Sequence, residues 1–122
     1  MNENINIIEE LQAIKLLLVL SNSEKIDSYL NEVITTTVRR KIWTLVDGKR
    51  SPTELANEGN VTPAAITKFL NTVTEASLIK YEKGNPPKRV IEYTPAKWIK
   101  EIEENELKQQ KLKNLEEKKT EL

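Results

Sequence analysis

Cysteine and histidine are both absent from this chain of 122 residues. The missing thiols exclude disulfides, thiolate metal sites and cysteine nucleophiles, and the missing imidazoles exclude histidine acid–base catalysis. No apolar run exceeds the five residues Leu16 to Leu20, whereas a membrane-spanning helix needs about 20. No nucleophile–base pair, phosphate loop or metal cluster appears. We therefore expect no enzyme, no metal, no cofactor and no membrane span, and a cytoplasmic location (nucleoid-associated in a prokaryote).

Net charge is zero, but the charge is unevenly distributed along the chain. Residues 1–35 hold two lysines and six acids, whereas residues 36–95 hold ten lysines or arginines and six acids. Residues 96–122 hold seven of each sign. The length fits one domain with an appended arm. We expect N-terminal helices in 1–35 for dimerisation or support, a functional domain in 36–95, and a charged C-terminal helix in 96–122, partly solvated or in a coiled coil.

The N-terminal segment has the pattern of two helices. In residues 3–20, Ile7, Leu11, Ile14 and Leu18 are spaced by four, three and four residues and share one face. This face fits either a core helix or a dimer-forming helix. Residues 21–34 follow as a second helix, with Ser21 and Glu24 as a capping box.

Three helix starts follow in residues 36–77. A helix is expected over 37–47, ended by Asp47-Gly48, with Trp43 at the edge of an inward stripe formed by Val38, Ile42, Leu45 and Val46. Ser51-Pro52-Thr53-Glu54 starts a short helix, because serine caps, proline suits the first turn and glutamate closes the capping box. Thr62-Pro63 starts the next helix, over 62–77, with an inner stripe of Ile66, Leu70 and Val73.

Two short strands and a last helix complete the predicted order. Residues 78–83 and 88–94 alternate as strands do, on either side of Gly84-Asn85-Pro86-Pro87. Pro95 opens the last helix, in which Trp98 and Ile102 are apolar anchors. The expected fold class is mainly α with a small β-hairpin wing: a winged helix-turn-helix flanked by N-terminal helices and a long C-terminal helix.

This order of elements predicts sequence-directed binding to duplex DNA. The helix over 62–77 would lie in the major groove, which admits one helix. Asparagine pairs with adenine, lysine reaches guanine or phosphate, and threonine contacts a base edge or a thymine methyl. Because they lie opposite the inner stripe or at the helix cap, the expected base contacts are Thr62, Ala64, Thr67, Lys68 and Asn71, with Pro63 as a small neighbour. The bland alternative is a solvated polar face.

A second set of residues would contact the DNA backbone. The wing over 83–89 is stiffened by two prolines and would approach the minor groove or the phosphates. A helix N-terminus also attracts phosphate. The expected contacts are Arg39, Arg40, Lys49, Arg50, Ser51, Thr53, Lys83, Lys88 and Arg89, and among the wing residues Arg89 is the first choice. The alternative is that the wing charges only keep a sheet edge soluble.

The stretches TELANEGNVTPAAITKFLNTVTEASLIKY and PPKRVIEYTP resemble the ArsR/MarR-like winged-helix transcription regulators. Thr67-Lys68 falls where that family often has Ser-Arg, and Leu78-Ile79 falls at the step into the wing. The resemblance covers about half of the chain. It implies a homodimer that binds double-stranded DNA, here with Ile7, Leu11, Ile14, Leu18, Trp98 and Ile102 as dimerisation residues, and a palindromic site.

Two residues depart from the family pattern. Gly59 takes a turn position that is usually apolar, which predicts a looser brace, and Ser77 replaces a frequent glycine at some backbone cost. Metal-sensing relatives use cysteine or histidine ligands, which this chain lacks. Two other functions stay open: an architectural, chromatin-type DNA binder with little sequence preference, and a winged helix that contacts a protein partner through its N- or C-terminal helix.

Overall fold

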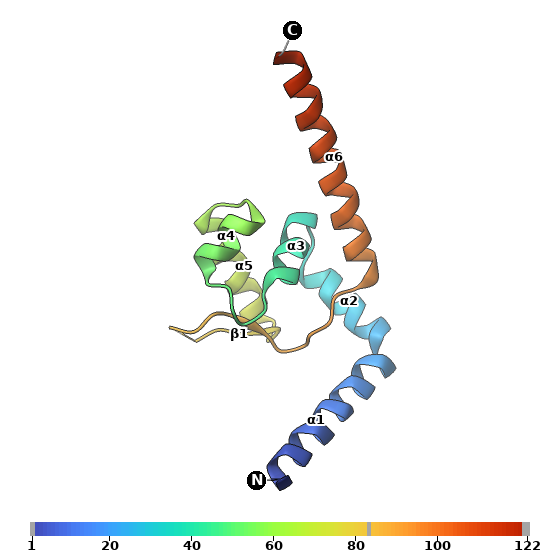
Figure 1. Ribbon diagram of the computed structural model, residues 1–122. Helices are drawn as coiled ribbons and strands as arrows, with labels where there is room; N and C mark the ends of the chain where they lie inside the picture. Colours follow the sequence, from blue (N-terminus) through green and yellow to red (C-terminus); the bar gives the residue numbers. More distant parts are fainter. Residues whose placement is uncertain (1, 83, 121–122) are drawn as a thin grey trace. The chain divides into compact units, whose positions relative to one another are not determined.

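The computed structural model describes residues 2–82 and 84–120. Within these residues it contains six helices and one two-stranded antiparallel sheet (Figure 1). The chain divides into two compact units, Met1–Glu32 and Val33–Leu122. The expectation of a mainly helical chain with a small pair of strands is therefore confirmed.

The first unit holds helix α1 (Asn2–Ser21) and most of helix α2 (Ser23–Val33). The two helices meet at Asn22, whose backbone N–H donates to the Leu18 carbonyl at 3.1 Å and whose side chain donates to the same oxygen at 2.7 Å. The Asn22 carbonyl in turn accepts from the Ile26 N–H at 2.9 Å. Ser21 is still part of α1, so the predicted capping box with Glu24 is wrong and the second helix starts two residues later.

Helix α3 (Thr37–Leu45) begins at a threonine cap, because the Thr36 hydroxyl accepts from the Arg39 N–H at 3.2 Å. It ends two residues before the predicted Asp47. The helix ends early because the next residues pair with a distant part of the chain. Asp47 forms an antiparallel bridge with Lys88, and the Gly48 N–H donates to the Pro87 carbonyl. Residues 46 and 47 are therefore extended instead of helical.

The predicted inward stripe of α3 needs two corrections. Val38 is 46% exposed, whereas Trp43 is fully buried. The Trp43 indole N–H donates to the Tyr93 carbonyl at 3.0 Å. Trp43 is thus a central core residue that holds the chain leading into the last helix, and it does not lie at the edge of the stripe.

The remaining elements of the second unit follow the predicted order. They are α4 (Pro52–Gly59), α5 (Pro63–Glu75), β1 (Ile79–Lys80), β2 (Lys88–Arg89) and α6 (Ala96–Thr120). The strands are shorter than expected, since only two residues of each form the ladder. Helix α4 packs on both α3 and α5, and the start of α6 packs on α3. This packing gives one core, formed by Ile42, Trp43, Val46, Leu55, Ile66, Phe69, Leu70, Val73, Leu78 and Trp98.

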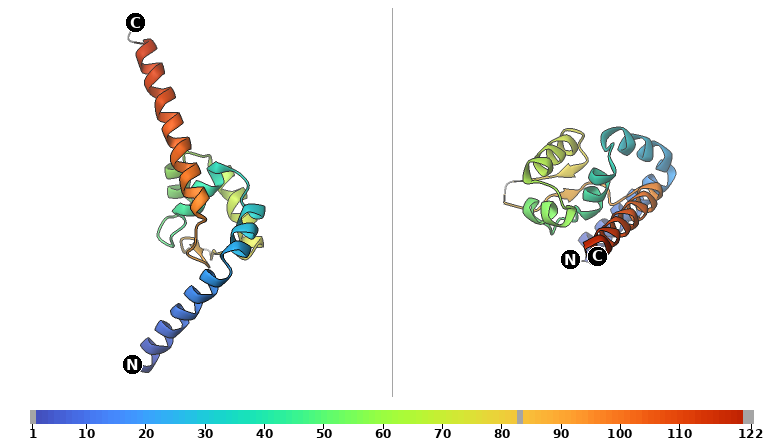
Figure 2. Two further views of the ribbon diagram at one scale, coloured as in Figure 1. Left: turned by 90° about the vertical axis from the view of Figure 1, so that its right-hand side faces the viewer. Right: turned by 90° about the horizontal axis from the view of Figure 1, so that it is seen from above.

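Helix α6 has a buried start and a solvated remainder. Trp98 is 1% exposed, whereas Leu107, Leu112 and Leu115 are all more than half exposed. Figure 2 shows α6 extending beyond the rest of the second unit. The exposed leucines leave both expected forms of this helix, partly solvated or in a coiled coil, as predictions.

Candidate nucleic-acid interface

Helix α4 is fixed at both ends by local hydrogen bonds. The Ser51 hydroxyl accepts from the Glu54 N–H at 3.2 Å and lies at the same distance from the Glu54 carboxylate. At the other end Asn60 adopts a left-handed conformation with φ 54°, and the Val61 N–H donates to the Ala56 carbonyl at 3.0 Å. This reversed last turn directs the chain from α4 into α5.

Gly59 brings the end of α4 close to α3. A Cβ atom on this buried glycine would lie 3.2 Å from Cγ1 of Ile42. The glycine therefore permits an approach that any larger residue would disturb. Gly59 thus allows close packing of α4 on α3, and the expected looser brace at this turn stays a prediction.

The inner face of α5 is buried as predicted. The Thr62 hydroxyl caps the helix by accepting from the Ala65 N–H at 3.1 Å. Ile66, Leu70 and Val73 are each at most 4% exposed. Phe69, which the sequence reasoning missed, is buried as well and completes the i, i+3, i+4, i+7 pattern that could have identified it.

The outer face of α5 exposes all six residues expected there: Thr62, Pro63, Ala64, Thr67, Lys68 and Asn71. The Thr67 hydroxyl donates to the Pro63 carbonyl at 3.1 Å. Its lone pairs and its methyl group remain available to a ligand. Lys68 forms no ion pair within the described residues. The structure thus brings these side chains onto one surface, and their contact with DNA stays a prediction.

Helix α5 ends in a second left-handed turn. Ser77 has φ 61°, its N–H donates to the Thr74 carbonyl at 3.0 Å, and the Leu78 N–H donates to the Val73 carbonyl at 2.9 Å. This pair of bonds is the Schellman arrangement that usually has glycine at the left-handed position. Serine therefore carries the backbone cost expected from the sequence.

The hairpin places two lysines directly opposite each other. β1 and β2 are antiparallel, with Lys80 paired to Lys88 and Ile79 paired to Arg89. Both lysines are exposed, whereas Ile79 is buried. Lys80 was not among the expected contacts, because only the register of the strands reveals its position. Lys83, which was expected on the wing, lies outside the described residues.

Arg89 is half-buried and packs inward from the hairpin. Adjacent residues of a strand point to opposite faces, so Arg89 lies on the inner face with Ile79 while Lys88 lies on the outer face. Its guanidinium is 5.6 Å from the Trp43 ring centroid and donates to the Thr94 hydroxyl at 3.2 Å. Burial lowers the pKa of this guanidinium. Arg89 thus holds the hairpin to the core, and its expected role as the main contact with DNA stays a prediction, which this packing disfavours.

Arg50 is also engaged inside the protein. It pairs with Asp47 at 2.9 Å, contacts the Glu58 carboxylate and donates to the Leu45 carbonyl at 3.2 Å. The Lys49 N–H lowers the pKa of the Asp47 carboxyl, against the smaller effect of its burial, and Arg50 lowers it further. Arg50 therefore stabilises the loop before α4, while the Lys49 ammonium has no ion pair within residues 2–82 and 84–120.

The N-terminus of α4 gives weak support for a phosphate site. Ser51 uses its hydroxyl as the cap, and the Glu54 carboxylate lies beside it. A negative charge in the first turn repels an added anion. Thr53 is exposed, and its contact with phosphate stays a prediction.

Arg40 connects α3 to α6. Its guanidinium pairs with Glu101 at 2.9 Å, donates to the Ile34 carbonyl at 3.0 Å and lies 5.0 Å from the Trp98 ring centroid. The Thr37 hydroxyl, which donates to Glu101, lowers the pKa of that carboxyl, and Arg40 lowers it further. Arg40 is thus part of the internal packing, whereas its neighbour Arg39 has no described ion pair.

The expected dimerisation residues fall into two groups. Ile7, Leu11, Ile14 and Leu18 on α1 are each more than half exposed. Trp98 is buried inside the second unit and Ile102 is half-buried. The assignment of Trp98 to a dimer surface is therefore wrong, because its ring already packs against Arg40.

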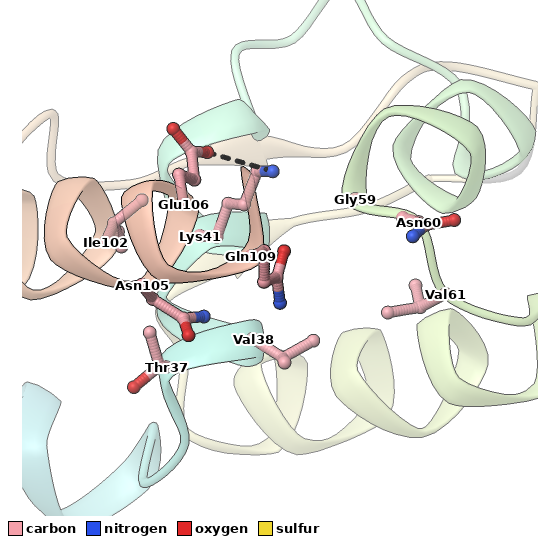
Figure 3. Close-up of a pocket in the computed structure, with 10 residues that line it drawn as sticks. All are labelled: Thr37, Val38, Lys41, Gly59, Asn60, Val61, Ile102, Asn105, Glu106 and Gln109. Atoms are coloured by element: carbon pink, nitrogen blue, oxygen red, sulfur yellow. Dashed lines mark ion pairs between the residues drawn. The ribbon is translucent and has the colours of Figure 1, made fainter. Parts of the chain in front are cut away.

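A pocket of about 170 Å³ lies between α3, the α4–α5 turn and α6. Figure 3 shows Val38, Val61 and Gln109 pointing into it from these three elements. An ion pair of 3.0 Å between Lys41 and Glu106 closes one side. Val38 is only half-covered because its side chain lines this pocket. Residues of α6 and of the α4–α5 turn line the same pocket, so these two segments lie near each other.

No family model matches this chain, and no curated protein or solved structure matches it either. Among residues 2–82 and 84–120, no helix is long and apolar enough to cross a membrane. In the same residues no group of three acidic side chains is placed to hold a metal ion.

Proposed function

We propose that Val33–Leu122 forms a winged helix-turn-helix that binds double-stranded DNA in a sequence-directed way and regulates transcription. In this proposal α4 braces α5, α5 enters the major groove, and the β1–β2 hairpin is the wing. The observation that carries the proposal is the division of α5 into two faces. Its large apolar side chains are buried, while Thr67, Lys68 and Asn71 are exposed together on the opposite side.

The exposed side chains suit the edges of base pairs. Asn71 can form two hydrogen bonds with adenine, and Lys68 can reach guanine or a phosphate. Thr67 offers a methyl group to thymine, because its hydroxyl proton is already donated to the Pro63 carbonyl. The small side chains of Pro63 and Ala64 let the start of α5 approach the groove closely.

The pair Lys80–Lys88 supports a phosphate contact at the wing. Like charges directly opposite each other in a sheet are destabilising, and this pair is exposed. A phosphate between the two ammonium groups would remove that repulsion. Self-association through α1 would supply a second copy of α5, and a two-fold arrangement then predicts a palindromic site with half-sites about 34–36 Å apart.

Binding measured against salt concentration tests the phosphate contacts. Lys49, Lys68, Lys80 and Lys88 are the lysines near α5 and the hairpin without described ion pairs. If all four contact phosphates, the slope of log K against log salt is about −3.6 per copy. Lys80→Ala should reduce its magnitude by about 0.9, whereas Lys100→Ala on α6 is the matched control and should leave it unchanged. Absence of binding at low salt would contradict the proposal.

Sequence preference distinguishes a regulator from an architectural binder. A regulator should prefer a selected site over random DNA by about 10³ or more. Asn71→Ala should cost about 1–3 kcal/mol at the base that it contacts and relax preference there. An unchanged preference in Asn71→Ala would mean that α5 is docked differently, and little preference in the natural protein would favour the architectural function.

Protein contact is the second candidate function. The observation in its favour is that Arg40, Lys41 and Arg50 form internal ion pairs, which leaves fewer cations for DNA than the sequence indicates. The exposed leucines along α6 could contact a partner helix instead. A natural protein that binds no DNA at low salt, yet loses a copurifying partner when α6 is truncated, would establish this function.

A further inference from the structure

Helix α1 exposes large apolar side chains from Ile5 to Leu20. Ile7, Leu11, Ile14 and Leu18 on one face are 53%, 59%, 52% and 59% exposed. An apolar surface of this size on an isolated helix usually marks an interface. The residue types at these four positions indicate which partner covers this apolar face.

The spacing of the four residues fixes their heptad positions. In a heptad the step from a to d is three residues and the step from d to a is four. The steps of four, three and four therefore place Ile7 and Ile14 at d and Leu11 and Leu18 at a. Isoleucine at a with leucine at d favours two strands, whereas leucine at a with isoleucine at d favours three or four. The chain has the second arrangement.

The flanking positions favour four strands in the same way. Ile8 falls at e and Leu17 at g, and they are 54% and 63% exposed. A two-stranded coil buries mainly a and d, whereas a helix in a four-stranded bundle contacts two neighbours and needs the wider face that includes e and g. Four strands thus cover six of these apolar side chains per chain, and two strands cover four.

The charged flanking residues favour a parallel arrangement. Glu10 lies at g and Lys15 lies five residues later at e. In a parallel, in-register coil, position g of one helix faces position e of the next heptad on its neighbour, so Glu10 meets Lys15 of another copy. In an antiparallel coil with the same core, g faces g, and Glu10 would lie beside Leu17 instead.

We propose that four copies of this chain assemble through a parallel four-stranded coil formed by α1. The occupant of the exposed face is therefore the same face of other copies. This assembly does not require DNA binding, and it contains four copies instead of the two expected from the sequence. Each assembly would carry four copies of the second unit.

The mass of the full chain in solution tests the number of copies. Sedimentation equilibrium should give four times the monomer mass of 14.0 kDa. In a variant that exchanges the two residue types, Ile7→Leu, Leu11→Ile, Ile14→Leu and Leu18→Ile, the composition is unchanged, but isoleucine now lies at a. This variant should give twice the monomer mass. A natural chain that sediments as one or two copies would overturn the proposal. An exchange variant that stays at four would overturn the assignment of the a and d residues as the cause, because Ile8 and Leu17 are kept in it.

A pair of matched variants tests which face is buried. Leu16 and Leu18 are both 59% exposed, but Leu16 lies at f, on the outside of the coil. Leu18→Asp should reduce the mass to that of one chain, and Leu16→Asp should leave four copies. The opposite result would place the interface on the other side of α1. Circular dichroism of both variants confirms that the second unit remains folded.

A single cysteine tests the direction of the helices, since the natural chain has none. Asn4 lies at an a position near the start of α1, so Asn4→Cys brings thiols together in a parallel coil and should give disulfide-linked pairs under oxidation. In an antiparallel coil the same residues would be about 25 Å apart at 1.5 Å per residue. Four copies without linked pairs would refute the parallel arrangement.

Discussion

Replacing Ser77 with glycine should stabilise the second unit. Ser77 ends α5 with φ 61° and is exposed to solvent. The Ser77 N–H donates to the Thr74 carbonyl, and the Leu78 N–H donates to the Val73 carbonyl. Glycine can keep both hydrogen bonds, because they use only the backbone.

Two opposing terms determine the size of the effect. A left-handed backbone costs an L-residue about 1–2 kcal/mol, a cost that glycine lacks. Glycine also makes the unfolded chain more flexible, which costs about 0.4–1 kcal/mol. The difference is a net stabilisation of roughly 0.5–1 kcal/mol. For a unit of this size it should raise Tm by roughly 3–6 °C, because 1 kcal/mol corresponds to about 4–8 °C in domains of 60–100 residues.

Thermal unfolding followed by circular dichroism measures this shift, and a urea titration measures the free energy of unfolding. Ser77→Ala is the matched control, because alanine keeps the strained backbone and gains no flexibility. It should leave the unit no more stable than serine does. Ser51→Ala is a control of opposite sign, since loss of a helix cap costs about 1 kcal/mol. A Ser77→Gly variant less stable than the natural chain would refute the reasoning that the left-handed turn is strained.

Further predictions concern the contacts that hold α3. The substitution Glu101→Gln weakens the pairing with Arg40. The pKa of Glu101 is lower in the folded than in the unfolded chain. The charged carboxylate therefore stabilises the fold above the unfolded pKa, and this stabilisation is lost as pH falls through the folded pKa. The difference between natural chain and variant in urea midpoints should therefore be large at pH 7 and small at pH 2–3. Gly59→Val should destabilise by about 1–3 kcal/mol in urea unfolding, because the added atoms would overlap buried Ile42. Trp43→Phe removes an indole hydrogen bond of 3.0 Å and buried volume, so we expect a loss of about 2 kcal/mol.

The starts of α4 and α5 could be predicted from the sequence because their chemistry is local. Ser51 and Thr62 each accept a hydrogen bond from an N–H only three residues away. No knowledge of the rest of the fold is needed to recognise such a cap. The exposed outer face of α5 follows equally from local spacing, once Ile66 and Val73 are assigned to the core.

The roles of the large cationic and aromatic residues could not be predicted in this way. Trp43 bonds to a carbonyl 50 residues away, and Arg40 pairs with a carboxylate 61 residues away. Such partners meet only when the chain is folded. The residues that neighbour Arg40 in the sequence therefore predict a solvated charge instead of an ion pair. Helix α3 also ends early because of a distant partner, since Asp47 forms a β-bridge with Lys88.

The hairpin lies between these two cases. Two adjacent residues of a strand cannot both face the same ligand, so Lys88 and Arg89 could have been separated once the strand was assumed. Which of them faces outward depends on the register with β1, and that register is tertiary information. It assigns Lys88 to the exposed pair with Lys80 and Arg89 to the contact with Trp43.

The proposed assembly and the proposed DNA binding are connected by the number of available cations. With three of the cations of residues 36–95 in internal ion pairs and Arg89 half-buried, one copy has few phosphate contacts and should bind weakly. Linking binding units raises the overall affinity by about 10²–10⁴ without any new contact. The exchange variant of α1, which carries two copies instead of four, should therefore bind DNA with several sites more weakly than the natural protein. Its affinity for a DNA with one site should be unchanged, because α5 and the hairpin are intact. Equal loss on both DNAs would mean that α1 acts on the second unit itself and not through the number of copies.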